Sequence, residues 1–215
     1  TKQISGTQIR NKLQAGDPKW TTSVASQVSS YMLSSRISSI FEHGMVLWLT
    51  GCPCSGKTTI ANKLVDMVKT RFPLLKYQLL DGDVIRSGPL AKTTGFSKQD
   101  RANHIRRMAY LANMFADHGI LVVCSFVSPD RKIRSEAKKM IGKKRFIEIY
   151  IKASKQTRIQ RDTKGLYKKA MAGKLKQLTG FDAGYDIPKH PDIVCNTDEL
   201  SVNSSAEIII RYVFH

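Results

Sequence analysis

The sequence predicts an α/β fold of three layers, in which helices cover both faces of a mainly parallel central sheet. From residue 45 onward, short apolar runs typical of buried strands alternate with longer segments of helical periodicity. A glycine-rich loop joins the first apolar run to the first helical segment. The 215 residues, 41% of them hydrophobic, are enough for one sizeable core. We therefore expect one main domain, residues 44–215.

The expected elements alternate along this domain. Strands are expected at residues 45–50, 77–80, 120–126, 146–151 and 192–195, and helices near 57–71, 100–118, 131–141, 154–161 and 204–213. Residues 1–43 do not fit the alternation, because they are rich in Ser and Thr and show only a modest helical stripe. We expect them to form a short helical N-terminal arm or linker. Because the strands are parallel, ligands should bind at their carboxyl ends.

The loop after the first expected strand carries a phosphate-binding pattern. Gly51, Gly56, Lys57 and Thr58 fill the spacing G-x-x-x-x-G-K-[ST], which predicts a P-loop NTPase-type fold. The glycines let backbone N–H groups close around phosphate oxygens, Lys57 adds a cation, and Thr58 offers a hydroxyl to Mg²⁺. The alternative is a tight glycine-rich turn without a ligand, which the complete match of the pattern disfavours.

Two carboxylates follow the second expected strand. Asp81 and Asp83, separated by Gly82, fall at the edge of the sheet where the phosphate loop also opens. Carboxylates in this place suit a metal-organising or proton-accepting role beside a transferring phosphoryl group. The alternative is a polar turn that ends the strand, with Asp as a local cap.

A capping box at Ser97 to Asp100 opens the helix that follows. Arg101 falls on the inward stripe of this helix and His104 at its edge. A guanidinium on the buried side of a helix needs an anionic partner, either a structural carboxylate or a ligand phosphate or sulfate. Phe96, just ahead of the helix, either stacks on a base or belongs to the core.

Two later segments also reach the carboxyl edge of the sheet. Ser128 follows the strand at 120–126 and places a hydroxyl there, while Arg131 and Arg134 lie either on a solvated helix face or around a nucleotide. Residues 161–180 are basic and contain three glycines. This composition suits a mobile cationic lid over phosphates, with a plain solvated loop as the alternative.

The charge balance calls for anionic partners. Lys and Arg number 35 against 17 Asp and Glu, a formal net charge of +18. No zinc finger, aromatic-interleaved basic strand or helix-turn-helix accompanies this charge, so we expect no nucleic-acid partner. The longest apolar run, 119–127, is too short to span a membrane, and we expect no membrane association. Four cysteines without disulfide or zinc spacing indicate reduced thiols and a cytoplasmic location, with an organelle left open.

Several motifs carry a family resemblance. They are Trp48-Leu49-Thr50-Gly51 with the phosphate loop, Leu80-Asp81-Gly82-Asp83 with Ile85-Arg86, Gly95-Phe96-Ser97 with Asp100-Arg101, Ser125-Phe126-Val127-Ser128-Pro129, Arg161-Asp162 with Lys164 to Ala170, and Thr179-Gly180. In this order, residues 44–200 resemble the adenylylsulfate (APS) kinase family, which uses ATP to phosphorylate the 3′-hydroxyl of APS and yields PAPS. The resemblance implies a phosphotransferase of sulfate activation.

The resemblance implies a role for each matching position. ATP phosphates would be bound by Gly51, Cys54, Ser55, Gly56, Lys57, Thr58 and Thr59, with Mg²⁺ at Thr58. APS would be bound by Asp83, Arg86, Phe96, Arg101, His104, Val127, Ser128, Lys164, Gln177 and Leu178. The catalytic set would be Lys57, Asp81, Asp83 and Ser128. Asp83 would orient the APS hydroxyl or accept its proton, and Ser128 matches a serine sometimes described as a phosphorylated intermediate. We prefer direct in-line transfer, because positioning and charge neutralisation are sufficient.

The chain departs from the family pattern on the acceptor side. His104 stands where the family usually has Asn, and Gln177-Leu178 where it has Gly-Phe. Ala183-Gly184-Tyr185-Asp186 and Ser87-Gly88-Pro89 depart as well. ATP binding is therefore better supported than APS affinity. A non-catalytic PAPS-sensing domain and another small-molecule P-loop kinase are the alternatives. The sensor is disfavoured by four intact residues, Lys57, Thr58, Asp81 and Asp83.

The first residues resemble a second enzyme. Ile4 to Thr7, Arg10, Leu13, Gly16 and Trp20 are similar to the closing segment of ATP sulfurylase, which makes APS. This implies that the chain is the C-terminal part of a bifunctional sulfurylase and kinase. The family resemblance also implies a homodimer.

Overall fold

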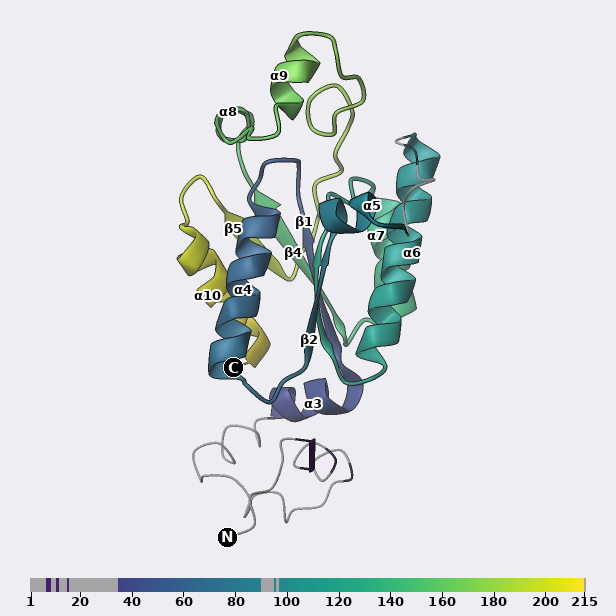
Figure 1. Cartoon of the computed structure of the whole chain (residues 1–215), viewed down its shortest axis with the longest axis vertical. Coiled ribbons are helices and arrows are strands. Elements are labelled where there is room, and N and C mark those ends of the chain that lie inside the picture. Colours follow the sequence, from purple (N-terminus) through teal and green to yellow (C-terminus); the bar gives the residue numbers. More distant parts are fainter. Residues whose placement is uncertain are drawn as a thin grey trace.

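A parallel sheet between two layers of helices forms the body of the protein (Figure 1). The computed structural model describes residues 7, 8, 11, 15, 35–89, 95 and 97–214. Within these residues the strands are β1 (Met45–Thr50), β2 (Tyr77–Asp81), β3 (Leu121–Ser125), β4 (Phe146–Lys152) and β5 (Ile193–Asn196). All neighbouring pairs are parallel, and the order is β2-β3-β1-β4-β5. The expected three-layer fold is confirmed.

The burial of the central strands explains why they appear in the sequence as continuous apolar runs. Every residue of β1 and β3 is buried, because helices cover both of their faces. In the register, Leu47 lies between Val123 on one side and Ile147 on the other. Each described strand lies within one residue of its expected bounds at both ends.

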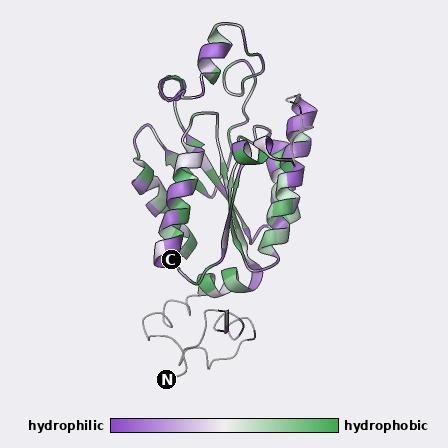
Figure 2. Cartoon of the chain, viewed as in Figure 1, coloured by the Kyte–Doolittle hydropathy of each residue, from purple (hydrophilic) through white to green (hydrophobic). Residues whose placement is uncertain are grey.

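The helices divide between the two faces of the sheet. One face is covered by α4 (Lys57–Arg71) and α10 (Val202–Phe214), with α3 (Ser35–His43) closing the end of the same core. The other face is covered by α6 (Lys98–Ala116) and α7 (Arg131–Ile141). Figure 2 shows the hydrophobic residues gathered on the strands and on the inner sides of these helices. Of the expected N-terminal arm, α3 is described, and it adds Ile40 and Phe41 to the core; most of the arm lies outside the described residues.

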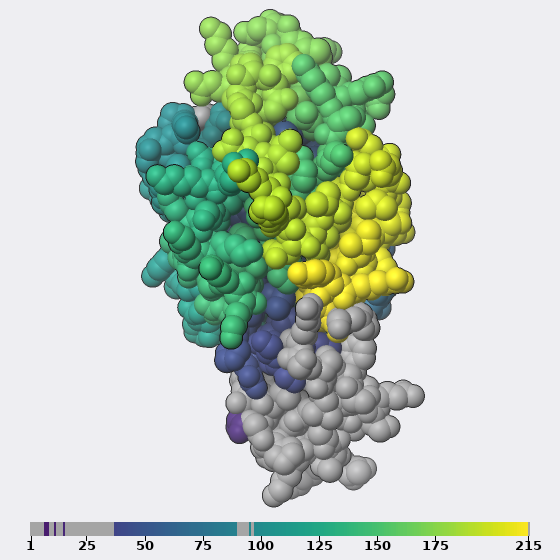
Figure 3. All heavy atoms as spheres, turned by 180° about the vertical axis from the view of Figure 1, so that it is seen from behind, coloured from purple at the N-terminus to yellow at the C-terminus, as the bar shows by residue number. Residues whose placement is uncertain are grey.

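A smaller unit stands beyond the carboxyl ends of the strands. It contains α8 (Lys155–Gln160) and α9 (Leu166–Met171) and has its own small core around Tyr167, Ala170 and Leu178 (Figure 1). From behind, the chain that returns from this unit runs down between α7 and α10 (Figure 3). We call residues 161–187 the lid segment. Its helix α9 and the short α5 (Gly82–Ser87) were not expected from the sequence.

The described residues contain no helix that is both long enough and apolar enough to cross a membrane.

Candidate active site

The phosphate loop links the end of β1 to the start of α4. Cys54 and Gly56 both have left-handed backbone conformations, with φ of 62° and 97°. At Gly51 a side chain would collide with the backbone oxygen of Ile151 on β4. The 15-residue helix α4 begins without a side-chain cap, so its first N–H groups face the loop unblocked by a capping side chain. This backbone arrangement has the form of an anion-binding nest, and phosphate binding by the loop stays a prediction.

Lys57 lies across the loop. Its Nζ donates to the backbone oxygen of Cys52 at 2.8 Å, and the residue is buried. Burial lowers the pKa of Lys57 to about 8, against the opposing effect of Cys52 and Asp83. The loop therefore holds a cation whose charge is only partly balanced, and a phosphate would complete that balance.

Thr58 and Asp81 join the loop to the end of β2. Thr58 Oγ1 donates to Asp81 Oδ2 at 2.7 Å. The other carboxylate oxygen, Oδ1, accepts from the backbone N–H groups of Asp83 at 2.9 Å and Val84 at 3.3 Å. Asp81 is therefore a helix cap for α5 and also the partner of the loop hydroxyl, and its role beside a metal or a phosphoryl group stays a prediction.

The same pair fits a magnesium ion. A hydroxyl and a carboxylate oxygen are hard ligands of the kind Mg²⁺ takes, together with substrate phosphates and waters. Among the described residues, no group of three or more His, Cys, Asp or Glu is arranged as a metal site. A metal here would thus be held by few protein groups, as is usual for Mg²⁺ beside a nucleotide.

Asp83 meets the lid segment. It lies in the first turn of α5 and forms an ion pair with Lys164, and both side chains are exposed. The carboxylate is therefore held at the open edge of the sheet and not in the interior. A substrate hydroxyl can reach it.

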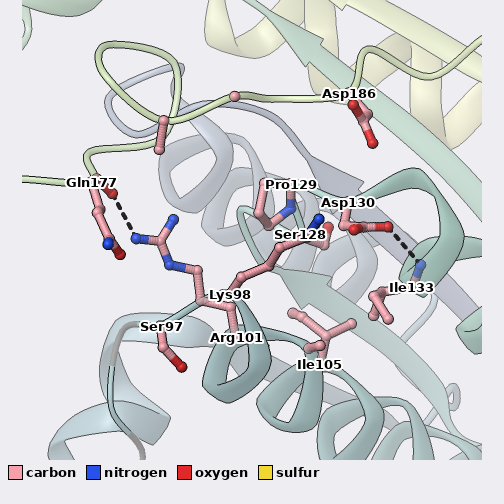
Figure 4. A pocket seen from close by; sticks show the side chains of 13 residues that line it. Ser97, Lys98, Arg101, Ile105, Ser128, Pro129, Asp130, Ile133, Gln177 and Asp186 are labelled. Atoms are coloured by element: carbon pink, nitrogen blue, oxygen red, sulfur yellow. Dashed lines mark hydrogen bonds between the residues drawn. The ribbon is translucent and has the colours of Figure 1, made fainter.

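A cavity of about 380 Å³ adjoins this edge (Figure 4). Its walls come from α6, from the loop between β3 and α7, and from the lid segment. Arg101 reaches from α6 to the lid, where Nη1 donates to Thr179 Oγ1 at 2.8 Å and Nη2 to the Gln177 oxygen at 2.6 Å. These two partners are neutral, and the carboxylate or ligand anion expected for this guanidinium stays a prediction. Burial lowers the pKa of Arg101, while Asp182 acts in the opposite direction.

His104 lies one turn beyond Arg101 and is buried. Neither ring nitrogen has a hydrogen-bond partner, and Phe126 packs edge-on against the ring with centroids 6.3 Å apart. Burial, with Arg86 and Arg107 nearby, lowers the pKa of His104 to about 4. The ring is therefore neutral at pH 7. Burial also lowers the pKa of Arg86, with Arg101 adding to the effect.

Ser128 is held in a closed network of hydrogen bonds. Its Oγ accepts from Trp48 Nε1 at 3.1 Å and donates to Thr50 Oγ1 at 2.9 Å. Thr50 Oγ1 also lies 3.0 Å from the hydroxyl of Tyr185. The residue is buried and has a left-handed φ of 36°. Its hydroxyl therefore donates one hydrogen bond and accepts one within the protein, and its proton is already committed to Thr50.

The remaining expected residues fall into different places. Gln177 lines the cavity, while Leu178 points into the small lid core. Ser55 is buried with an unpartnered hydroxyl, and Thr59 is exposed. The Val127 oxygen accepts from Thr50 at 2.9 Å. Phe96 lies outside the described residues.

Several residues at the site were missed. Arg158 is buried and donates to the Tyr167 hydroxyl at 2.8 Å and the Gly180 oxygen at 3.3 Å, which ties the lid together. Arg161 holds Thr197 by two bonds of 2.9 Å, and Thr197 donates to the Ser55 oxygen at 3.1 Å. Arg161 stood in a quoted motif, so that motif was the signal for it.

Known proteins resemble this chain over most of its length. A family model described as adenylylsulphate kinase matches residues 43–196. The probable adenylyl-sulfate kinase of Aeropyrum pernix is 38% identical over 174 residues, which cover 80% of this chain and 93% of that protein. The adenylyl-sulfate kinase of Gloeothece citriformis is 40% identical over 171 residues, covering 79% and 94%. The Mycobacterium tuberculosis APS kinase CysC, solved with AMPPNP and APS, matches with a TM-score of 0.75 at 34% identity over 80% of this chain and 98% of that one.

Proposed function

The chain belongs to the adenylylsulphate kinase family, and from this premise we propose that it transfers the γ-phosphoryl group of ATP to the 3′-hydroxyl of APS. The products are ADP and PAPS. One observation carries the proposal within the structure. The phosphate loop, Asp83 and the cavity beside Arg101 all open at the carboxyl edge of one parallel sheet.

The donor half is formed by the phosphate loop. Its left-handed turn and the start of α4 bind the β- and γ-phosphates of ATP, and buried Lys57 adds a positive charge. Thr58 would hold Mg²⁺ through its hydroxyl, with Asp81 orienting that hydroxyl. When bound, the ion neutralises charge on the phosphate oxygens.

The acceptor half is formed by Asp83 and the cavity. Asp83 orients the 3′-hydroxyl of APS and accepts its proton as the oxygen bonds to phosphorus and ADP leaves. Lys164 beside Asp83 and Arg86 nearby supply positive charge for an anionic acceptor. Transfer is direct and in line, because the Ser128 hydroxyl is engaged by Trp48 and Thr50.

A second candidate function is a PAPS-sensing domain without turnover. A sensor does not need the Thr58 and Asp81 pair, since it binds no γ-phosphate. The 2.7 Å bond between these residues therefore favours the enzyme.

Two assembly features remain proposals. We expect a homodimer and a fusion or partnership with ATP sulfurylase, the latter on the sequence pattern of the first residues. Light scattering on the purified chain tests the dimer, which a monomer at micromolar concentration would contradict. Recovery of sulfurylase activity with the parent protein tests the partnership.

The function itself is tested by incubating the chain with ATP, Mg²⁺ and APS and separating the nucleotides. The proposal requires ADP and PAPS. Tight PAPS binding without turnover would favour the sensor, and turnover with a different hydroxyl compound would favour another small-molecule kinase.

A further inference from the structure

We propose that Arg134 is a positioning residue for the acceptor side of the reaction. It joins two backbone segments, residues 127–131 and 185–187, which together form one wall of the cavity. The inference rests on the proposed function, because it assigns this cavity to APS. From the sequence, Arg134 belonged either to a solvated face or around a nucleotide. The solvated face is wrong, because the residue is 2% exposed.

The guanidinium of Arg134 is matched on three sides. Nε donates to Glu148 Oε1 on β4 at 2.8 Å, Nη1 to the Ser128 oxygen at 2.7 Å, and Nη2 to the Asp186 oxygen at 2.6 Å. The carboxylate balances the charge, and the two backbone oxygens set the distance between their segments. Only a planar fork of donors meets this geometry, so Lys is not equivalent here.

The two segments touch at further points around Arg134. The backbone N–H of Asp186 donates to the Pro129 oxygen at 2.8 Å, and the N–H of Arg131 donates to Asp186 Oδ2 at 3.1 Å. Ser128, Pro129, Asp130 and Asp186 all line the cavity (Figure 4). Arg134 lies behind this wall, and it therefore acts on the cavity through the wall.

Tyr185 connects Arg134 to the hydrogen-bond network of Ser128. The guanidinium carbon lies 5.6 Å from the centre of the Tyr185 ring, a cation–π contact, and the Tyr185 hydroxyl lies 3.0 Å from Thr50 Oγ1. Thr50 in turn receives the Ser128 hydroxyl at 2.9 Å. Loss of the guanidinium would remove a contact at Ser128 and a contact at Tyr185, the two ends of this network. The left-handed backbone at Ser128 would then be less firmly held.

The effect should fall on APS and not on ATP. The hydrogen bonds of Arg134 go to Glu148, Ser128 and Asp186, none of which belongs to the phosphate loop. If the two wall segments are less ordered in the free enzyme, they must become ordered when APS binds. The free energy needed for this ordering lowers the affinity for APS. The signature is a rise in KM for APS while KM for ATP stays constant.

The test compares Arg134→Lys with Arg106→Lys. Arg106 is the control, because it also bonds a glutamate, Glu136 of α7, at 2.8 Å, is half-exposed, and is not among the residues that line the cavity. Arg134→Lys should raise KM for APS about tenfold, the loss expected for one buried hydrogen bond to a charged donor, and leave KM for ATP within about twofold. Glu148→Gln, which keeps the shape of the partner, should raise KM for APS by a smaller factor. Arg106→Lys should change neither constant.

Hydrogen exchange provides a readout that does not need turnover. Arg134→Lys should speed amide exchange in residues 127–131 and 185–187, and Arg106→Lys should not. Unchanged exchange in both segments, or a parallel rise of both KM values, would overturn the inference. Failure of the unmodified chain to phosphorylate APS would overturn the proposed function instead, so the two failures are distinguishable.

Discussion

Lys164 of the lid segment forms an ion pair with Asp83, 81 positions earlier in the chain. The basic segment is therefore in contact with the carboxylate in the first turn of α5. Because the lid also has a core of its own around Tyr167, it is a built unit and not a plain solvated loop. Whether it moves stays a prediction.

Replacement of Lys164 tests the contact with Asp83. Lys164→Ala removes a cation from the acceptor side and should lower kcat/KM for APS about tenfold, the value of one contact to a charged group. Lys174→Ala, an exposed lysine of the same segment, is the control and should have little effect. Steady-state kinetics with APS varied decide between them. Equal effects of the two changes would mean that only the summed charge of the segment matters.

Replacement of Ser128 tests direct transfer. Ser128→Ala removes the acceptor of Trp48 Nε1, so the free energy of unfolding should fall by about 1–3 kcal/mol. Activity at a temperature where the variant is folded should stay within about tenfold of the original. Thermal melts, kinetics and mass spectrometry of the protein after turnover give the answer. Complete loss of activity, with phosphoserine trapped in the unmodified chain, would establish a phosphorylated intermediate.

Titration of Lys57 should appear in ATP binding. Its pKa in the free protein is about 8, so the side chain loses its charge as the pH rises above that value. At pH 9 about a tenth of the molecules keep the cation, by the ordinary titration relation, and KM for ATP should rise about tenfold relative to pH 7. The measurement is KM for ATP from pH 7 to 9.5, with Lys57→Arg, which stays charged, as the comparison. A flat profile for the unmodified chain would contradict the assignment of Lys57.

Burial of His104 predicts a pH dependence of stability. The pKa of His104 is about 4 in the folded protein and about 6.5 in the unfolded chain, so the unfolded chain binds more protons between these values. The free energy of unfolding should therefore fall as the pH drops from 6.5 toward 4, by up to about 3 kcal/mol. Urea unfolding at pH 7 and pH 4 measures this fall. His104→Asn should show a smaller fall over the same range, and an identical fall would place its origin elsewhere.

The sequence indicated the sheet well, because buried parallel strands are continuous apolar runs. Residues 45–50 match β1 at both ends for this reason. It did not indicate α5 or α9, each of six residues, although it indicated α8, which has the same length. A helix of about one and a half turns shows little helical period, so the sequence signal for such elements is weak. The helix α5 is fixed by the capping of Asp81, and α9 by the packing of Tyr167.

The sequence predicted the phosphate loop, which is the donor half of the site, better than the acceptor half around Asp83 and the cavity. The phosphate loop is local in sequence, so its pattern specified it. The network around Ser128 joins it to Trp48, 80 positions away, and brings Tyr185 to Thr50 across 135 positions. Such contacts depend on the tertiary fold, and one sequence carries no signal for them. The same reason explains why the burial of Arg134 was missed.

The central claim is tested most directly by the fate of the γ-phosphoryl group. With γ-labelled ATP, Mg²⁺ and APS, the account predicts one labelled 3′-phosphate in PAPS for each ADP formed. Asp83→Asn should lower that rate by about 10²–10⁴-fold, the usual contribution of a positioned base, while ATP binding is unchanged. Label released as free phosphate at the same rate with and without APS, or a rate unaffected by Asp83→Asn, would contradict the account.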